Sequence, residues 1–136
     1  MKNLAALSLA AFAAACTATA GDAPSEMSAT AQSRLTEELR GRVAGPPLSC
    51  VSQRDLRGNR SVGEDVILFD GPSKDVVYVN RPSGGCPQLN SGRALITRTT
   101  SNQLCRGDIA VVFDTASGIE FGGCGLGDFT PYRRVR

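Results

Sequence analysis

The chain has no histidine and no tryptophan, and only seven of its 136 residues are Phe or Tyr. Without histidine, it cannot form the Ser-His or Cys-His pairs that activate most protein nucleophiles. The carboxylates of the body fall mostly at expected strand ends beside turns, where Asp is common for hydrogen-bonding reasons. We therefore predict that the chain is not an enzyme and that it holds no cofactor.

Strong charge of either sign is also missing. The formal net charge is +2, and removal of a leader that contains Lys2 lowers it to +1. Nucleic-acid binding proteins concentrate basic residues on one surface, so we expect no nucleic-acid partner. Thirteen of the 15 cations are Arg, which we attribute to genomic base composition rather than to phosphate recognition.

Long apolar runs are limited to the amino terminus. Lys2 precedes an apolar stretch of 12 residues, Leu4–Ala15. A transmembrane helix needs about 20 apolar residues, so this stretch is too short to span a bilayer. Its basic start and apolar centre are typical of a cleavable export signal.

Two cleavage sites compete at the end of this signal. Ala13-Ala14-Ala15-Cys16 resembles a bacterial lipobox, although Ala13 stands where Leu is usual. Ala18-Thr19-Ala20 is an A-x-A site that would release a soluble protein starting at Gly21. We favour lipidation of Cys16, because a cysteine at the end of an apolar signal is otherwise rare.

This choice defines the expected organisation and location. We expect a signal at 1–15, a flexible tether at 16–29 and one β-rich domain at 30–136. The partner is then a membrane, bound through the lipid on Cys16 at the periplasmic face of the outer membrane. The alternative is cleavage after residue 20, which gives a soluble periplasmic or secreted protein.

One short helix is predicted at the start of the domain, over residues 29–43. Ser28 is its candidate N-cap. Leu35, Leu39 and Val43 recur every four residues and give a thin apolar stripe. Gly45-Pro46-Pro47 follows and would end the helix.

The remaining chain predicts a small antiparallel β-sandwich or barrel. Short β-branched and aromatic runs alternate with Gly, Pro, Asn and Ser, and no helix separates them as it would in a parallel sheet. Two β-hairpins are expected, with turns at Gly71–Lys74 and Thr115–Gly118. The expected strands are 65–70, 75–80, 93–100, 108–114, 119–124 and 128–132.

Four cysteines lie in the body: Cys50, Cys86, Cys105 and Cys124. They form no C-x-x-C pair and lack histidine partners, so we expect two disulfides rather than a metal site. Four cysteines allow three connectivities. In the second hairpin Cys124 would face about Ile109, which places Cys105 too far along for a bond. We predict Cys86–Cys105 with Cys50–Cys124.

A resemblance accompanies these cysteines. Cys50-Val51, Gly85-Cys86-Pro87-Gln88-Leu89, Leu104-Cys105-Arg106-Gly107-Asp108 and Cys124 resemble the pattern of an uncharacterised family of small exported bacterial proteins, often lipoproteins. The likeness covers residues 48–130. It implies export and a four-cysteine β domain, and it implies no catalytic residue.

Two functions are compatible with this sequence. The first is a non-enzymatic structural or accessory domain of the cell envelope, with an envelope protein as a possible partner. The second is a secreted or lipid-anchored inhibitor or ligand-binding module, for which the polar, turn-rich stretch Asn80–Gly92 is the candidate surface. An ordinary connecting loop is the favoured interpretation of that stretch. The oligomeric state stays open.

Overall fold

The computed structural model describes residues 27–89 and 93–136. These residues form one α-helix, one short 3-10 helix and ten β-strands. The elements are α1 (Ala29–Glu38), β1 (Arg42–Ala44), β2 (Cys50–Ser52), η1 (Gln53–Asp55), β3 (Gly58–Val62), β4 (Val66–Asp70), β5 (Val76–Asn80), β6 (Arg93–Thr97), β7 (Gln103–Cys105), β8 (Ile109–Asp114), β9 (Glu120–Gly125) and β10 (Phe129–Arg134). The predicted fold class, mainly antiparallel β with one helix and two disulfides, is confirmed.

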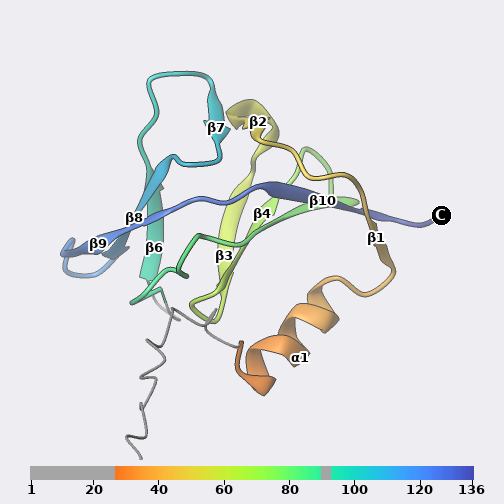
Figure 1. Ribbon diagram of the computed structural model, residues 1–136, viewed down its shortest axis with the longest axis horizontal. Coiled ribbons are helices and arrows are strands. Elements are labelled where there is room, and N and C mark those ends of the chain that lie inside the picture. The colour runs from red at the N-terminus through yellow and green to blue at the C-terminus, as the bar shows by residue number, and fades with distance from the viewer. Residues whose placement is uncertain (1–26, 90–92) are drawn as a thin grey trace, which may run out of the picture.

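The strands form three antiparallel sheets (Figure 1). The largest has the order β1-β10-β5-β4-β3, the second has the order β6-β8-β9, and the third pairs β2 with β7. Arg42 and Ala44 of β1 lie opposite Arg134 and Tyr132 of β10. An early strand and a late strand of the domain therefore lie side by side, and β10 is inserted between β1 and β5.

One face of the five-stranded sheet packs against both smaller sheets. Successive residues of a strand point to opposite sides, so Ile67 and Phe69 of β4 share this face with Tyr78 of β5 and Phe129 of β10. Val51, Leu95 and Leu104 of the smaller sheets belong to the same buried cluster. The Phe69 and Phe129 ring centroids are 5.5 Å apart. We call this side the closed face.

The opposite side of the same sheet packs against α1, and we call it the helix face. Leu68 of β4 and Val79 of β5 are buried there against Ala31 and Leu35 of the helix. A single helix of ten residues is about 15 Å long. It covers only part of a five-stranded sheet.

The helix begins where the sequence predicts and ends earlier. The Ser28 hydroxyl accepts a hydrogen bond from the Ala31 N–H at 3.2 Å. The predicted end at residue 43 is wrong, because Gly41 takes φ 69° and turns the chain back before the Gly-Pro-Pro segment. Val43 consequently belongs to β1, where its side chain is 60% exposed.

Both predicted hairpins are confirmed. β4 pairs with β5, and β8 pairs with β9. A bulge between Val111 and Phe113 shifts the second register by one residue, so Cys124 lies opposite Ala110 rather than Ile109.

The predicted disulfide pairing is wrong. The bonds are Cys50–Cys105 and Cys86–Cys124, with Cα atoms 4.0 Å and 5.1 Å apart. Excluding Cys105–Cys124 was correct. The partner of Cys50 was misassigned because β2 and β7, each three residues long, were not predicted, and their pairing places Cys50 directly opposite Cys105.

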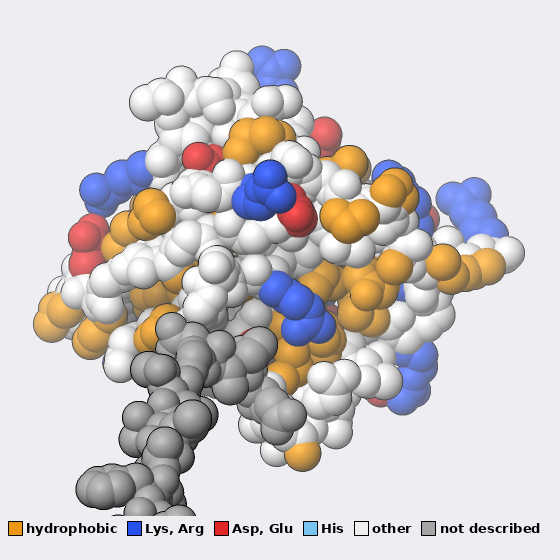
Figure 2. Space-filling view, viewed as in Figure 1, with side chains coloured by type: hydrophobic (Ala, Val, Ile, Leu, Met, Phe, Trp, Pro, Cys, Tyr) orange, Lys and Arg blue, Asp and Glu red, His pale blue; other side chains and the backbone are white. Residues whose placement is uncertain are grey.

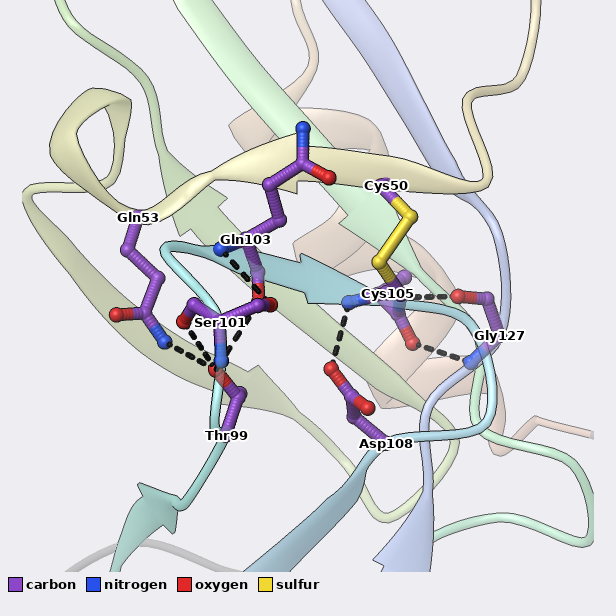
Figure 3. Close-up of a disulfide and its surroundings, with 9 residues drawn as sticks. Cys50, Gln53, Thr99, Ser101, Gln103, Cys105, Asp108 and Gly127 are labelled. Carbon is purple, nitrogen blue, oxygen red and sulfur yellow. Dashed lines mark hydrogen bonds between the residues drawn. A yellow bond between two sulfur atoms is a disulfide. The ribbon is translucent and has the colours of Figure 1, made fainter.

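The two bonds have different surroundings. Cys86 and Cys124 lie in the closed-face core, 0% and 5% exposed. Cys50 and Cys105 are half-buried at the β2–β7 pair, where polar contacts surround them (Figure 3). The Asp108 carboxylate accepts a hydrogen bond from the Cys105 N–H at 2.8 Å.

Candidate anion-binding cleft

The cysteines named as site residues have structural roles where the structure describes them. Cys50, Cys86, Cys105 and Cys124 are all in disulfides, so none of them is a free thiolate. Cys16, the expected lipidation site, lies outside the described residues. Within residues 27–89 and 93–136, no group of three or more His, Cys, Asp or Glu side chains is placed to hold a metal ion.

The stretch Asn80–Gly92 is largely built into the domain, as far as residue 89. Asn80 is fully buried, and its amide group exchanges two hydrogen bonds with the Gly127 backbone, at 2.8 and 3.0 Å. Cys86 and Leu89 are also buried. These contacts fit a connecting segment better than a projecting recognition loop. Residues 90–92 lie outside the described ranges.

A cleft of about 590 Å³ opens instead at the end of the five-stranded sheet that α1 leaves uncovered. Cations dominate its walls, and among the described residues Asp70 is the one carboxylate that lines it. We call it the basic cleft. Its lining consists of Arg42, Arg57, Arg60, Asp70, Gly71, Pro72, Ser73, Lys74, Val76, Val77 and Arg134.

Strand register explains why these side chains meet. Arg42 and Arg134 are directly opposite each other in the β1–β10 pair. Two residues before Arg134, Tyr132 lies opposite Val77, whose side chain is on the helix face. Because side chains alternate along a strand, Arg42 and Arg134 project from the helix face as well.

Arg60 holds one wall through ion pairs. Its Nε and Nη2 donate to Glu38 at 3.2 and 2.7 Å, and its Nη1 donates to Asp70 at 2.5 Å. The hydrogen bond to Glu38, partly opposed by burial, raises the pKa of the Arg60 guanidinium. Arg60 therefore links α1, β3 and β4 and has both carboxylates as partners.

The guanidinium of Arg42 has fewer hydrogen-bond partners than that of Arg60. Its Nη2 donates to the Lys74 carbonyl at 2.8 Å, whereas Nε and Nη1 are shielded from solvent and have no hydrogen-bond partner in the described part of the chain. Burial, followed by repulsion from Arg134, lowers the pKa of Arg42, although Asp75 partly opposes this shift. An unsatisfied buried donor typically costs about 1–3 kcal/mol.

Three more cations at the cleft have no carboxylate partner. Among the described residues, the side chains of Arg57, Lys74 and Arg134 form no ion pair and no hydrogen bond. They reach the cleft from three places: the residue before β3, the β4–β5 turn and β10. The cleft therefore has a surplus of positive charge that an anion would neutralise.

A second hollow on the helix face is a useful comparison. It has a volume of about 340 Å³ and is lined by Pro47, Val79, Arg81, Asp128, Thr130 and Tyr132. Figure 2 shows hydrophobic side chains gathered between α1 and strands β1 and β10. Arg81 and Asp128 balance in charge there, so this hollow lacks the electrostatic surplus of the basic cleft.

No family model, curated protein or solved structure matches this chain. The resemblance to a family of four-cysteine exported proteins therefore stays a prediction. Within the two described ranges, no helix is both long and apolar enough to cross a membrane. The two disulfides are compatible with an extracytoplasmic location.

The basic cleft was missed by reasoning from the sequence. Its cations come from positions 42 to 134 and form no local motif. The only available signal was the excess of Arg, which we attributed to base composition. The β1–β10 pairing places Arg42 opposite Arg134, more than ninety positions later in the sequence. A short sequence pattern cannot predict such a long-range contact.

Proposed function

We propose that this chain is an exported, non-enzymatic β domain that binds an anionic ligand in the basic cleft. One observation carries this function: Arg57, Lys74 and Arg134 line a hollow of about 590 Å³ and have no carboxylate partner among residues 27–89 and 93–136. Cavities of about 300–1,000 Å³ are typical of small-molecule sites. The ligand-binding module is therefore favoured over a purely structural envelope domain.

Binding rather than catalysis fits the chemistry of the cleft. Of the described residues that line it, Ser73 alone has a hydroxyl group. The sequence has no histidine that could act as its base. Arg side chains are poor proton carriers because they stay charged, and they suit the recognition of carboxylates and phosphates.

The domain is proposed to work in the cell envelope, at the periplasmic face, held by a lipid on Cys16. The apolar stretch Leu4–Ala15 followed by Cys16 supports export and anchoring. Mass spectrometry of the mature protein tests the anchor, and a diacylglyceryl-modified Cys16 is expected. An unmodified amino terminus at Gly21 would instead make the protein soluble, without affecting the ligand site.

Two neighbouring arginines give a matched test of ligand binding. Arg134 lines the basic cleft, whereas Arg133 points to the opposite side of the sheet and does not line it. Arg134→Gln and Arg133→Gln remove the same charge from adjacent positions. Calorimetric titration with pyrophosphate and with citrate, at low ionic strength, compares the two variants with the parent protein.

We expect at least one of these anions to bind the parent protein and to bind more weakly as salt is added. Arg134→Gln should lower the affinity about tenfold, which corresponds to about 1.4 kcal/mol, and Arg133→Gln should leave it nearly unchanged. Absence of binding to the parent protein, or equal losses in both variants, would overturn the proposed function.

A further inference from the structure

The basic cleft also indicates which anion it takes. We infer that its ligand is a phosphomonoester, a phosphate group with two negative charges on a larger molecule, seated between the β4–β5 turn and Arg134. This inference rests on the proposed function and specifies its ligand class.

The cations of the cleft favour a ligand that has more than one negative charge. Arg60 is already paired with Glu38 and Asp70. In the described part of the chain Arg57, Lys74 and Arg134 have no carboxylate partner, and Arg42 is desolvated beside Arg134. A single carboxylate would match one Arg side chain and leave the other cations repelling one another. A dianion neutralises the site more completely.

The geometry of the donors favours a tetrahedral group over a planar one. A carboxylate presents two oxygens in one plane, which fits one planar guanidinium. A phosphomonoester presents three terminal oxygens in different directions. Lys74 and Arg134 approach the cleft from two segments that meet where the Arg134 N–H donates to the Asp75 carbonyl at 2.9 Å, so their side chains can meet different oxygens of one phosphate.

The β4–β5 turn contributes a fixed support for such a group. The Gly71 N–H donates to the Val76 carbonyl at 2.9 Å, and the Ser73 hydroxyl accepts from the Asp75 N–H at 3.3 Å. A Cβ on Gly71 would lie 2.8 Å from Val76, so glycine is needed for this tight turn. The turn presents the Ser73 hydroxyl and the Lys74 ammonium together at the cleft. Hydroxyl and Lys donors are common partners of phosphate.

The size of the cleft implies that the phosphate belongs to a larger molecule. A volume of about 590 Å³ is within the range of sites for drug-sized ligands and exceeds the needs of one phosphate. Val76 and Val77 also line the cleft and offer apolar surface to the remainder of the ligand. Such a ligand can be a soluble phosphate ester or the headgroup of a phospholipid.

Methyl phosphate and methyl sulfate test the charge requirement directly. The two probes have nearly the same tetrahedral shape, but only methyl phosphate becomes a dianion, with a second pKa near 6. We expect calorimetry at neutral pH to show about tenfold tighter binding of methyl phosphate than of methyl sulfate. At about pH 5 the preference should largely disappear, because methyl phosphate is then mostly a monoanion.

Citrate and the Lys74 variants test the shape requirement and the site. Methyl phosphate should compete with citrate despite the higher charge of citrate. Lys74→Gln should reduce methyl phosphate binding about tenfold, Lys74→Arg should retain most of it, and Arg133→Gln is the control for charge loss outside the cleft. Circular dichroism of each variant confirms that the fold is intact.

Vesicles separate the two sources of phosphate. Phosphatidylcholine vesicles containing phosphatidic acid carry a phosphomonoester, whereas those containing phosphatidylglycerol carry only diesters. Preferential co-sedimentation with phosphatidic acid, lost in Lys74→Gln, would support the inference with a lipid headgroup as the source. Binding of methyl phosphate without that preference would support it with a soluble ester.

Two further results have distinct meanings. Equal affinity for methyl phosphate and methyl sulfate, or tighter binding of citrate, would overturn the phosphomonoester while leaving an anion-binding cleft in place. Failure of methyl phosphate, pyrophosphate and citrate all to bind would overturn both the inference and the proposed function.

Discussion

The two faces of the five-stranded sheet share the same strands and differ in what covers them. The closed face is covered by two further sheets and by the buried Cys86–Cys124 bond. The helix face is covered by α1 over one part only and ends in the basic cleft. Neighbouring residues of one strand, such as Leu68 and Phe69, thus lie in different environments.

This difference separates the apolar core from the proposed ligand site. The closed face is covered by two other sheets, which exclude water, and the burial of its apolar side chains stabilises the fold. Charges cannot be kept there without a large desolvation cost. The uncovered end of the sheet keeps Arg57, Lys74 and Arg134 near solvent, where their charges stay hydrated.

The largest expected effect concerns the two disulfides. They span 55 and 38 residues, and the chain-entropy model gives each about 4 kcal/mol. The loop lengths therefore predict similar stabilisation by the two disulfides, but the disulfides differ in burial. Cys86→Ala with Cys124→Ala should destabilise more than Cys50→Ala with Cys105→Ala, because it also removes packed sulfur atoms from the closed face.

Urea denaturation of the two double variants measures this difference, with peptide mapping under non-reducing conditions to confirm which bond remains. A larger loss from the Cys50 and Cys105 pair would show that the half-buried β2–β7 bond, rather than the closed face, dominates stability.

Ile67 and Leu68 compare the faces at adjacent positions of β4. Both side chains are fully buried, Ile67 on the closed face and Leu68 on the helix face. Substitution of such residues by Ala costs about 2–5 kcal/mol, depending on how far the surroundings collapse. We expect Ile67→Ala to lie near the upper end and Leu68→Ala near the lower end, because a single helix can shift more easily than two sheets.

Equilibrium unfolding of both variants gives the two free energies directly. Equal losses would mean that α1 is held as rigidly as the sheets. Hydrogen exchange of the α1 amides in Leu68→Ala provides the control, since a helix that has moved should show faster exchange.

Arg60 tests whether the ion pairs on the helix face stabilise it. Its side chain is 36% exposed and bonds both Glu38 and Asp70, so Arg60→Gln should cost about 1 kcal/mol, and less at high salt. Arg57→Gln removes the same charge from a side chain without a partner in the described ranges and should change stability by less than about 0.5 kcal/mol. Thermal unfolding at two salt concentrations measures the loss of stability in each variant. Equal losses in Arg60→Gln and Arg57→Gln would rule out a stabilising role for the Arg60 ion pairs.

The smallest expected effect lies in the β8–β9 turn, away from the helix face. Hydrogen bonds from the Ser117 and Ala116 N–H groups lower the pKa of Asp114 from its usual 3.8. Their stabilisation is present above pH 3.8 and is lost as pH falls through the lowered pKa. Asp114→Ala should lower Tm slightly at neutral pH and by less in strong acid. A Tm difference that grows in acid would contradict this assignment.

The sequence predicted the elements that carry local signals. The β4–β5 and β8–β9 hairpins have β-branched runs around turns rich in Gly, Pro and Ser, and α1 begins at a Ser N-cap. β1, β2 and β7 have three residues each, too few to show a period of two, and β3 reads GNRSV with little apolar character.

The basic cleft and the disulfide pairing depended on those missed strands. Cys50 is placed by the β2–β7 pair, and Arg42 by the β1–β10 pair. Both pairings join distant segments, and their register is set by packing in the folded domain rather than by local preference. A Cys105–Cys124 bond could be excluded from the sequence only because the β8–β9 hairpin joins segments that are close in the chain.

The position of β10 also has a consequence for the order of folding. Residues 129–134 form an interior strand of the five-stranded sheet, between β1 and β5 (Figure 1). During synthesis, β1 therefore stays without its partner strand until this late segment has been made. A chain halted before Phe129 would lack this interior strand, and β1 would have no strand to pair with. The topology thus delays completion of the five-stranded sheet until residues 129–134 have been made.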